Sequence, residues 1–207
     1  GKTLFDDFSR GRYSTDASVY QIKPIGVVLP KDTNDVLNIM DYSQRNSIPL
    51  LARGGGSSQC GQTVGESVVL DYSRHQNKIL ELNVEEKYVW VQPGVVLDHL
   101  NSFLKPHGLW FPVDVSTSSR ATVGGMSANN SCGSRSLYYG NMVHNVLAIE
   151  AILDDGSLHT FNEINKNYLT ITNNQDRFYK IIDKFLHLRQ KVSQDIDENW
   201  PTTQRRV

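Results

Sequence analysis

Glycine is concentrated in two short windows of this sequence, and this concentration limits what the chain can fold into. Of 15 glycines, five lie in residues 54–65 and four in residues 124–140. Glycine weakens helices and strands, so such clusters mark backbone that turns sharply or closely approaches another group. Two such loops in a chain of 207 residues predict a single ligand that is contacted twice.

Charge and cysteine content exclude several classes of protein. The 21 Lys and Arg residues balance 22 Asp and Glu residues, whereas nucleic-acid binders usually carry a basic excess. No apolar run approaches the roughly 20 residues of a membrane span, and the N-terminus lacks the apolar core of a signal peptide. Cys60 and Cys132 are too few for a disulfide framework or for a metal site of their own. We expect a cytoplasmic protein with no nucleic-acid partner, no membrane span and no metal, and leave peripheral attachment to the inner membrane open.

Hydrophobic spacing predicts helices interspersed among short strands. The predicted strands are residues 25–29, 49–52, 68–71, 79–84, 88–92, 109–111, 146–153 and 158–161. The predicted helices are residues 34–45, 96–104 and 176–192, and residues 197–207 show no pattern. Because this order is neither a regular βαβ alternation nor all-β, the predicted class is α+β.

The first glycine loop, residues 53–65, follows a predicted strand. Its consecutive Gly54, Gly55 and Gly56 allow several peptide N–H groups to converge, and such a nest binds phosphate without a cation. Ser57 and Ser58 add hydroxyl donors. A Walker A loop is disfavoured because Gln62 stands where its lysine should be. A glycine-rich loop without any ligand remains the alternative.

The second glycine loop, residues 122–140, contains a possible helix start. Thr122 can cap a helix that opens at Gly124 and Gly125, and its N-terminus would then face a phosphate. Asp114, shortly before this loop, could bind a ring or ribose hydroxyl or could be a solvated turn residue. His99, His107, His144 and His159 lack metal-ligand spacing.

Six sequence blocks together resemble a known family. The blocks are residues 53–58, 61–62, 91–94, 111–114, 121–125 and 139–140. In order and spacing, from about residue 25 to residue 161, they resemble the FAD-binding domain of the p-cresol methylhydroxylase/vanillyl-alcohol oxidase superfamily. Residues 13–18, 129–134 and 204–207 resemble the FAD-linked oxidases of the D-lactate/D-2-hydroxyglutarate dehydrogenase type. These oxidases are similar to glycolate-oxidase flavin subunits and often carry a fused iron–sulfur region.

The resemblance implies two α+β lobes with FAD in the cleft between them. The lobes would be residues 25–94 and 95–195, after an N-terminal extension at 1–24 and before the start of a linker at 196–207. FAD would be non-covalent, because Ser57 and Arg120 stand where some members carry a histidine or cysteine attachment. The residues implied to contact FAD are Arg53, Gly54, Gly55, Gly56, Ser57, Ser58, Gln62, Pro112, Asp114, Thr122, Gly124, Gly125, Ala128, Asn129, Asn130, Gly133 and Val146.

The resemblance also implies oxidation of a D-2-hydroxy acid of the lactate, glycolate or 2-hydroxyglutarate type, by hydride transfer to flavin N5. Family members place the substrate (cap) domain and catalytic residues after this domain, so we expect an inactive fragment. Its partner would be the remainder of the same polypeptide, and the electron acceptor stays unidentified. The alternatives are a non-catalytic nucleotide-binding module and an enzyme of the UDP-N-acetylenolpyruvoylglucosamine reductase type. Arg205 and Arg206 could pair with a substrate carboxylate or form a charged tail.

Overall fold

The computed structural model describes residues 1–164 and 177–201, and the chain divides into two compact units. The first comprises residues 1–146 and 154–156, and the second comprises residues 147–153 and 157–207. Arg205, Arg206 and residue 176, where a helix is predicted to begin, lie outside the described residues. The predicted lobe boundary at residues 94–95 stays a prediction.

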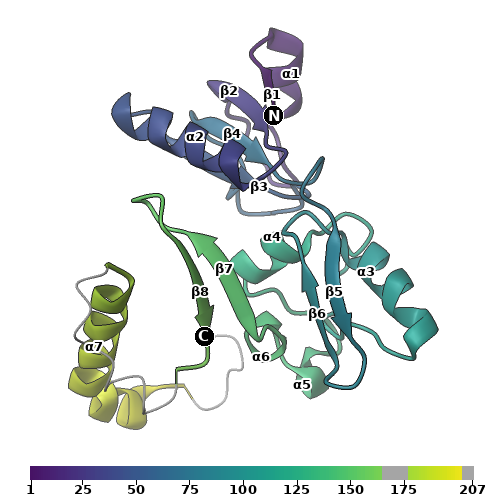
Figure 1. Ribbon diagram of the computed structural model, residues 1–207, viewed down its shortest axis with the longest axis vertical. Helices are drawn as coiled ribbons and strands as arrows, with labels where there is room; N and C mark the ends of the chain where they lie inside the picture. Colours follow the sequence, from purple (N-terminus) through teal and green to yellow (C-terminus); the bar gives the residue numbers. More distant parts are fainter. Residues whose placement is uncertain (165–176, 202–207) are drawn as a thin grey trace. The chain divides into compact units, whose positions relative to one another are not determined.

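The helices and strands follow one another in mixed order (Figure 1). They are β1 (Lys2–Leu4), α1 (Asp7–Arg12), β2 (Gly26–Leu29), α2 (Thr33–Arg45), β3 (Leu50–Arg53), β4 (Val68–Asp71), β5 (Ile79–Asn83), β6 (Tyr88–Val91), α3 (Leu97–Leu104), the 3-10 helix η1 (Lys105–His107), α4 (Val123–Ala128), α5 (Ser136–Tyr139), α6 (Met142–Asn145), β7 (Ala148–Ile152), β8 (Leu158–Asn162) and α7 (Arg177–Asn199).

A four-stranded sheet in the order β1-β2-β4-β3 forms the first part of the first unit. Strands β2, β4 and β3 are parallel, and β1 is antiparallel to β2. The first glycine loop belongs to the connection between β3 and β4, so it leaves an edge strand and returns to an inner one. The three strands predicted at residues 25–29, 49–52 and 68–71 are thereby confirmed.

The two faces of this sheet are covered by different parts of the chain. On one face, Val28 and Leu70 pack against Ile39 of α2, which Figure 1 shows lying beside the sheet. On the other face, Val27 and Val69 pack with the buried ring of Tyr13. Because successive side chains of a strand point to opposite faces, the apolar runs of β2 and β4 bury both faces of the sheet.

A hairpin and a helix form the next part of the first unit. Strands β5 and β6, predicted as strands at residues 79–84 and 88–92, pair antiparallel. Helix α3 presents Leu100 and Leu104, which pack with Val95 against Leu82 and Val89 of the hairpin. The helix predicted at residues 96–104 is confirmed, and of its apolar residues Leu97, Leu100 and Leu104 are buried whereas Phe103 is exposed.

Residues 109–111 are not a strand, contrary to the prediction from their apolar sequence. The side chain of Asn101, on α3, takes the place of a strand partner. Its Oδ1 accepts a hydrogen bond from Phe111 N at 2.7 Å, and its Nδ2 donates to Phe111 O at 3.4 Å. A side-chain amide thus satisfies the backbone groups of Phe111 without a sheet.

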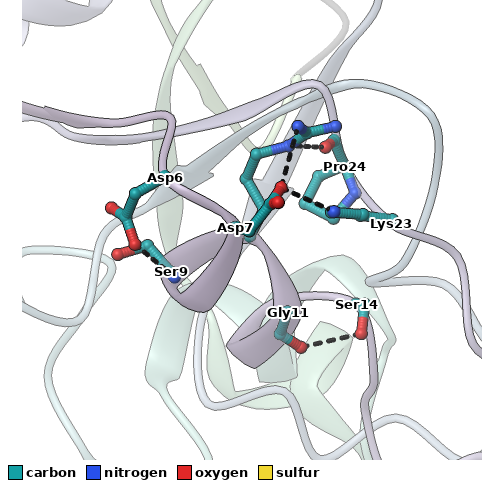
Figure 2. A network of polar contacts seen from close by, with 8 residues as sticks. Asp6, Asp7, Ser9, Gly11, Ser14, Lys23 and Pro24 are labelled. Atoms are coloured by element: carbon teal, nitrogen blue, oxygen red, sulfur yellow. Dashed lines mark hydrogen bonds and ion pairs between the residues drawn. The ribbon is translucent and has the colours of Figure 1, made fainter.

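Helix α1, which the sequence did not predict, is held by polar contacts near the N-terminus (Figure 2). Ser9 N donates to the capping Asp6 Oδ1 at 2.8 Å. Asp7 pairs with Lys23 Nζ at 2.7 Å, and Arg10 Nε donates to Pro24 O at 2.8 Å. These contacts fasten the helix to the residues that immediately precede β2.

The second unit contains the β7–β8 hairpin and α7. The two strands, predicted at residues 146–153 and 158–161, pair antiparallel. Phe178 of α7 stacks on His159 at a centroid distance of 4.5 Å. The helix reaches residue 199, beyond the predicted end at 192, and Phe185 on it is 69% exposed. None of the helices in the described ranges has both the length and the apolarity that a membrane crossing requires.

Candidate cofactor-binding site

The two glycine loops lie directly against each other. A Cβ built at Gly54 would collide with Thr122 Oγ1 and would lie 3.2 Å from Thr122 Cβ. A Cβ at Gly55 would collide with the carbonyl oxygen of Arg120. The two loop segments therefore meet, as a shared ligand requires, and the ligand itself stays a prediction. At these two positions glycine is required by the close approach of the two backbone segments.

The first loop offers a row of unpaired peptide donors. Within residues 1–164 and 177–201, the N–H groups of residues 54–58 donate no hydrogen bond. Gly56 adopts a φ of +63°, which turns the loop in a way that favours glycine. Buried N–H groups in proteins are nearly always paired. A run of unpaired N–H groups that is half-buried except at the exposed Gly55 is therefore suited to an anion.

The side chain of Arg53 makes hydrogen bonds that support the backbone of this loop. Its Nη1 donates to Thr63 O at 2.9 Å, and its Nη2 donates to Thr15 O at 2.8 Å. The guanidinium also lies over the ring of Tyr13, 5.4 Å from the centroid. Burial lowers the pKa of Arg53, and the nearby Asp16 opposes that shift. The described contacts of Arg53 thus support the loop backbone, and contact with a cofactor stays a prediction.

The first peptide donors of the second loop are already paired with other groups of the protein. Val123 N donates to Val95 O at 2.8 Å, and Gly124 N donates to Pro93 O at 2.9 Å. Gly125 N donates to the capping Thr122 Oγ1 at 3.3 Å. Helix α4 begins at Val123, next to the predicted start at Gly124 and Gly125. Its first three N–H groups already have partners, and contact of this helix N-terminus with a phosphate stays a prediction. These N–H groups are paired with carbonyl oxygens at residues 93 and 95, in the turn before α3, and with the helix cap.

The carboxylate of Asp114 is hydrogen-bonded to two residues of the second loop. Its carboxylate accepts hydrogen bonds from Ser134 Oγ at 2.7 Å and from Arg135 N at 3.0 Å. Burial raises the pKa of Asp114, but these hydrogen bonds outweigh burial, and the pKa falls below its usual range. A Cβ at Gly133 would collide with the Asp114 carbonyl oxygen. Asp114 is therefore not a simple solvated turn residue, and its proposed bond to a cofactor hydroxyl stays a prediction.

The asparagines of the second loop also make contacts within that loop. Asn129 Nδ2 donates to Ser131 Oγ at 3.1 Å. Asn130 has a φ of +44°, and its Oδ1 accepts from Val143 N at 3.1 Å. His144 Nδ1 accepts from the buried Asn141 at 3.0 Å and thereby caps the short α6. His144 thus has a structural contact.

The remaining predicted residues are placed around these loops. Gln62 and Ala128 are exposed, and Ser57 and Ser58 are half-buried. Pro112 lines a pocket of about 290 Å³ beside Trp110 and Phe111. Val146 packs on the core that contains Met142. In the described part of the chain, no three His, Cys, Asp or Glu side chains are grouped for a metal ion.

Sequence reasoning missed a polar group beneath the first loop. Thr63 Oγ1 donates to Asp16 Oδ2 at 3.0 Å, and Tyr13 OH donates to Asp71 Oδ2 at 2.6 Å. Burial, together with the bond to Asp71, raises the pKa of Tyr13 to about 12. Residues 13–18 stood out in the sequence only as a resemblance, because no local pattern shows that they contact residues 53–63.

The geometry fits the cofactor that the sequence implied. FAD carries a diphosphate, which a nest of unpaired N–H groups accommodates. The absence of side chains at Gly54 and Gly55 lets the first loop lie against the Thr122 side chain and the Arg120 backbone. The first loop would hold the diphosphate. The second loop, whose first N–H groups are already paired, would form a rigid surface beside the cofactor.

Known proteins are similar to this chain in sequence and in fold. A family described as "FAD binding domain" matches residues 24–162. The chain is 44% identical to D-2-hydroxyglutarate dehydrogenase of Haemophilus influenzae over 155 residues, which cover 73% of this chain and 15% of that protein. It is 34% identical to the glycolate oxidase subunit GlcD of Bacillus subtilis over 162 residues, which cover 76% of this chain and 34% of that protein.

A solved structure supports the fold independently. The 6-hydroxy-D-nicotine oxidase of Arthrobacter nicotinovorans superposes with a TM-score of 0.71 at 19% identity, covering 82% of this chain and 37% of that one. The matched range of residues 24–162 agrees with the range over which the six sequence blocks were recognised. The chain therefore belongs to the FAD binding domain family of flavin-dependent oxidoreductases.

Proposed function

We propose that this chain holds FAD where the two glycine loops meet, and that it is the cofactor-binding part of a longer dehydrogenase for D-2-hydroxy acids. The observation that carries the proposal is the run of unpaired N–H groups at residues 54–58 beside residues 120–122. The names of the relatives, a D-2-hydroxyglutarate dehydrogenase and a glycolate oxidase subunit, support the substrate class.

The two loops would divide the work of binding. The N–H groups of residues 54–58 and the hydroxyls of Ser57 and Ser58 would donate to the diphosphate. The second loop would contribute a surface whose shape is fixed by its own hydrogen bonds, notably those to Asp114. Cofactor affinity would thus depend mainly on donors from the first loop and on close packing from the second.

The flavin, once bound, would supply the chemistry by accepting a hydride from the Cα atom of the hydroxy acid at N5. This chain would bind and orient the cofactor. It spans 15% and 34% of the length of the two curated relatives described above. We propose that the remainder of a longer polypeptide provides the substrate domain. We expect no dye reduction when a 2-hydroxy acid is added to this chain alone.

A titration with FAD tests the proposal. The variant Ser57→Glu adds a carboxylate to the first loop where a side chain already exists, and Gly55→Glu adds one beside Arg120. Both should weaken FAD binding at least about 100-fold, because a negative charge within the nest repels the diphosphate. The matched control is Gly11→Glu, since a Cβ at Gly11 meets nothing within 4 Å. It should bind FAD like the unmodified chain.

Two results would contradict the proposal. One is equal FAD affinity for Ser57→Glu and Gly11→Glu, measured by quenching of flavin fluorescence. The other is tighter binding of ATP than of FAD in a competition titration, which would favour the non-catalytic nucleotide-binding module. Thermal unfolding of each variant shows whether a loss of binding reflects a loss of fold.

A further inference from the structure

Residues 13–22 form a strap beside the first glycine loop, although they precede the matched family domain, which begins at residue 24. The strap closes on itself, because Ile22 N donates to Ser14 O at 2.9 Å and Thr15 pairs with Gln21. On its N-terminal side, the strap is continuous with α1, which is fastened to residues 23–24 (Figure 2). The strap is therefore anchored independently of the glycine loop.

Thr63, near the end of the first loop, is bonded through both its backbone and its side chain. Its carbonyl oxygen accepts from Arg53 Nη1 at 2.9 Å, and its hydroxyl donates to Asp16 Oδ2 at 3.0 Å. Arg53 itself donates to Thr15 O at 2.8 Å. The strap thus contacts the loop near its first and last residues, and Thr63 is the point where these bonds meet.

The middle of the loop also lies against the strap. A Cβ built at Gly61 would lie 2.6 Å from Cδ2 of the Tyr20 ring, and Gly61 has a φ of +76°. The carboxylate of Asp16 is occupied, since its Oδ1 accepts from Ser18 N at 2.8 Å and its Oδ2 accepts from Thr63. A charge that is held in this way orders the loop through a directed hydrogen bond.

We infer that this strap is a positioning element of the cofactor site: through Asp16 and Thr63 it fixes the first glycine loop in the shape that presents the N–H groups of residues 54–58. This inference rests on the proposed function. A glycine-rich loop has many accessible conformations, and ordering it during binding lowers affinity. If the loop already has its binding conformation before FAD binds, this loss of affinity is avoided.

The test compares two variants of Thr63, one that loses the hydroxyl bonded to Asp16 and one that keeps it. Thr63→Val keeps the side-chain shape and removes the hydroxyl, whereas Thr63→Ser keeps the hydroxyl. Thr63→Val should raise the Kd for FAD about tenfold, since the lost bond has a charged acceptor. Thr63→Ser should bind within about twofold of the unmodified chain. The control Asp41→Asn removes an exposed ion pair with Arg45 within α2, which plays no part in anchoring the strap, and should leave the Kd unchanged.

A second measurement follows the loop without any cofactor. Amide hydrogen exchange at residues 54–63 should become faster in Thr63→Val and stay unchanged in Thr63→Ser, because the bond to Asp16 orders the loop before FAD binds. The double variant Asp16→Ala/Thr63→Val should weaken FAD binding no more than the weaker-binding single variant, because both substitutions remove the same bond.

The possible outcomes separate this inference from the proposed function. If the unmodified chain does not bind FAD, the proposed function fails and the inference fails with it. If the unmodified chain binds FAD and Thr63→Val binds equally well, only the role of the strap is overturned. Loss of affinity in Thr63→Val with recovery in Thr63→Ser, at unchanged unfolding temperature, supports the strap as a positioning element.

Discussion

The two glycine loops look alike in sequence and differ in what they leave unpaired. In the first loop, the N–H groups of residues 54–58 have no partner among the described residues. In the second, Val123, Gly124 and Gly125 donate to groups of the chain itself. Glycine allows close packing in both loops, but only the first loop also presents a run of unpaired N–H donors.

This difference shows that a cluster of glycines does not by itself indicate a nest. A Cβ at Gly124 would lie 2.6 Å from Pro93 Cβ, and one at Gly133 would collide with the Asp114 carbonyl oxygen. Those glycines allow backbone segments to touch. Gly56, with its φ of +63°, lets the backbone turn beside donors that remain available. What distinguishes the loops is the pairing of their N–H groups, which is a property of the fold.

The largest expected effect comes from a substitution that disrupts packing in the second loop. Gly133→Ala should lower the free energy of unfolding by about 2–3 kcal/mol, because the added methyl group overpacks the contact with Asp114. Urea unfolding measures the change. The control is Gly65→Ala, where a Cβ would be at an ordinary 3.7 Å from Leu51 and Ser67, and its stability should change by less than about 0.5 kcal/mol. Equal stabilities for the two variants would contradict the packing role of Gly133.

An intermediate effect concerns the support beneath the first loop. Tyr13→Phe removes the bond to the buried Asp71 and should cost about 2 kcal/mol at neutral pH. The raised pKa of Tyr13, about 12, means that its contribution is complete below pH 10 and is lost as the pH rises through 12. The stability difference between the two proteins should therefore shrink between pH 10 and 12. A difference that stays constant over this range, in urea unfolding at several pH values, would show that Tyr13 titrates normally.

The smallest expected effect comes from removing the negative charge of Asp114, which accepts hydrogen bonds from the second loop. Asp114→Asn keeps the shape but loses the negative charge that Ser134 and Arg135 contact. We expect a loss of about 1 kcal/mol, since the side chain is partly exposed. Because the folded-state pKa of Asp114 is lowered, its stabilisation is present above pH 4 and is lost as the pH falls below that value. Chemical unfolding should thus distinguish the two proteins at pH 7 and not at pH 2, and a gap that persists in acid would contradict this role.

Sequence reasoning predicted the meeting of the loops but not the state of their donors. The order of the six blocks indicated that residues 54–58 and 122–125 share one ligand, and Gly54 does lie on Thr122. The partners of Gly124 and Val123 are Pro93 and Val95, which lie about thirty residues earlier in the chain. No local pattern of residue types shows such a pairing, because it depends on tertiary packing.

The errors in secondary structure have the same origin. Residues 109–111 have the composition of a strand, yet Asn101 satisfies the backbone of Phe111 instead. Helices α5 and α6 are short, and α6 depends on a cap formed by Asn141 and His144. Elements with their own apolar periodicity, such as α2 and α3, were predicted well because their local sequence and their burial agree.

The position of the first glycine loop between two parallel strands limits its length as well as its shape. Parallel neighbours cannot be joined by a tight turn, and their connection needs about a dozen residues or more. Residues 54–67 make this connection from the edge strand β3 to β4, without a helix to span it. Deleting even a few of these residues would make the connection too short and would disturb the pairing of β3 with β4. Variation in this loop between related proteins should therefore appear as residue replacements far more often than as shortening.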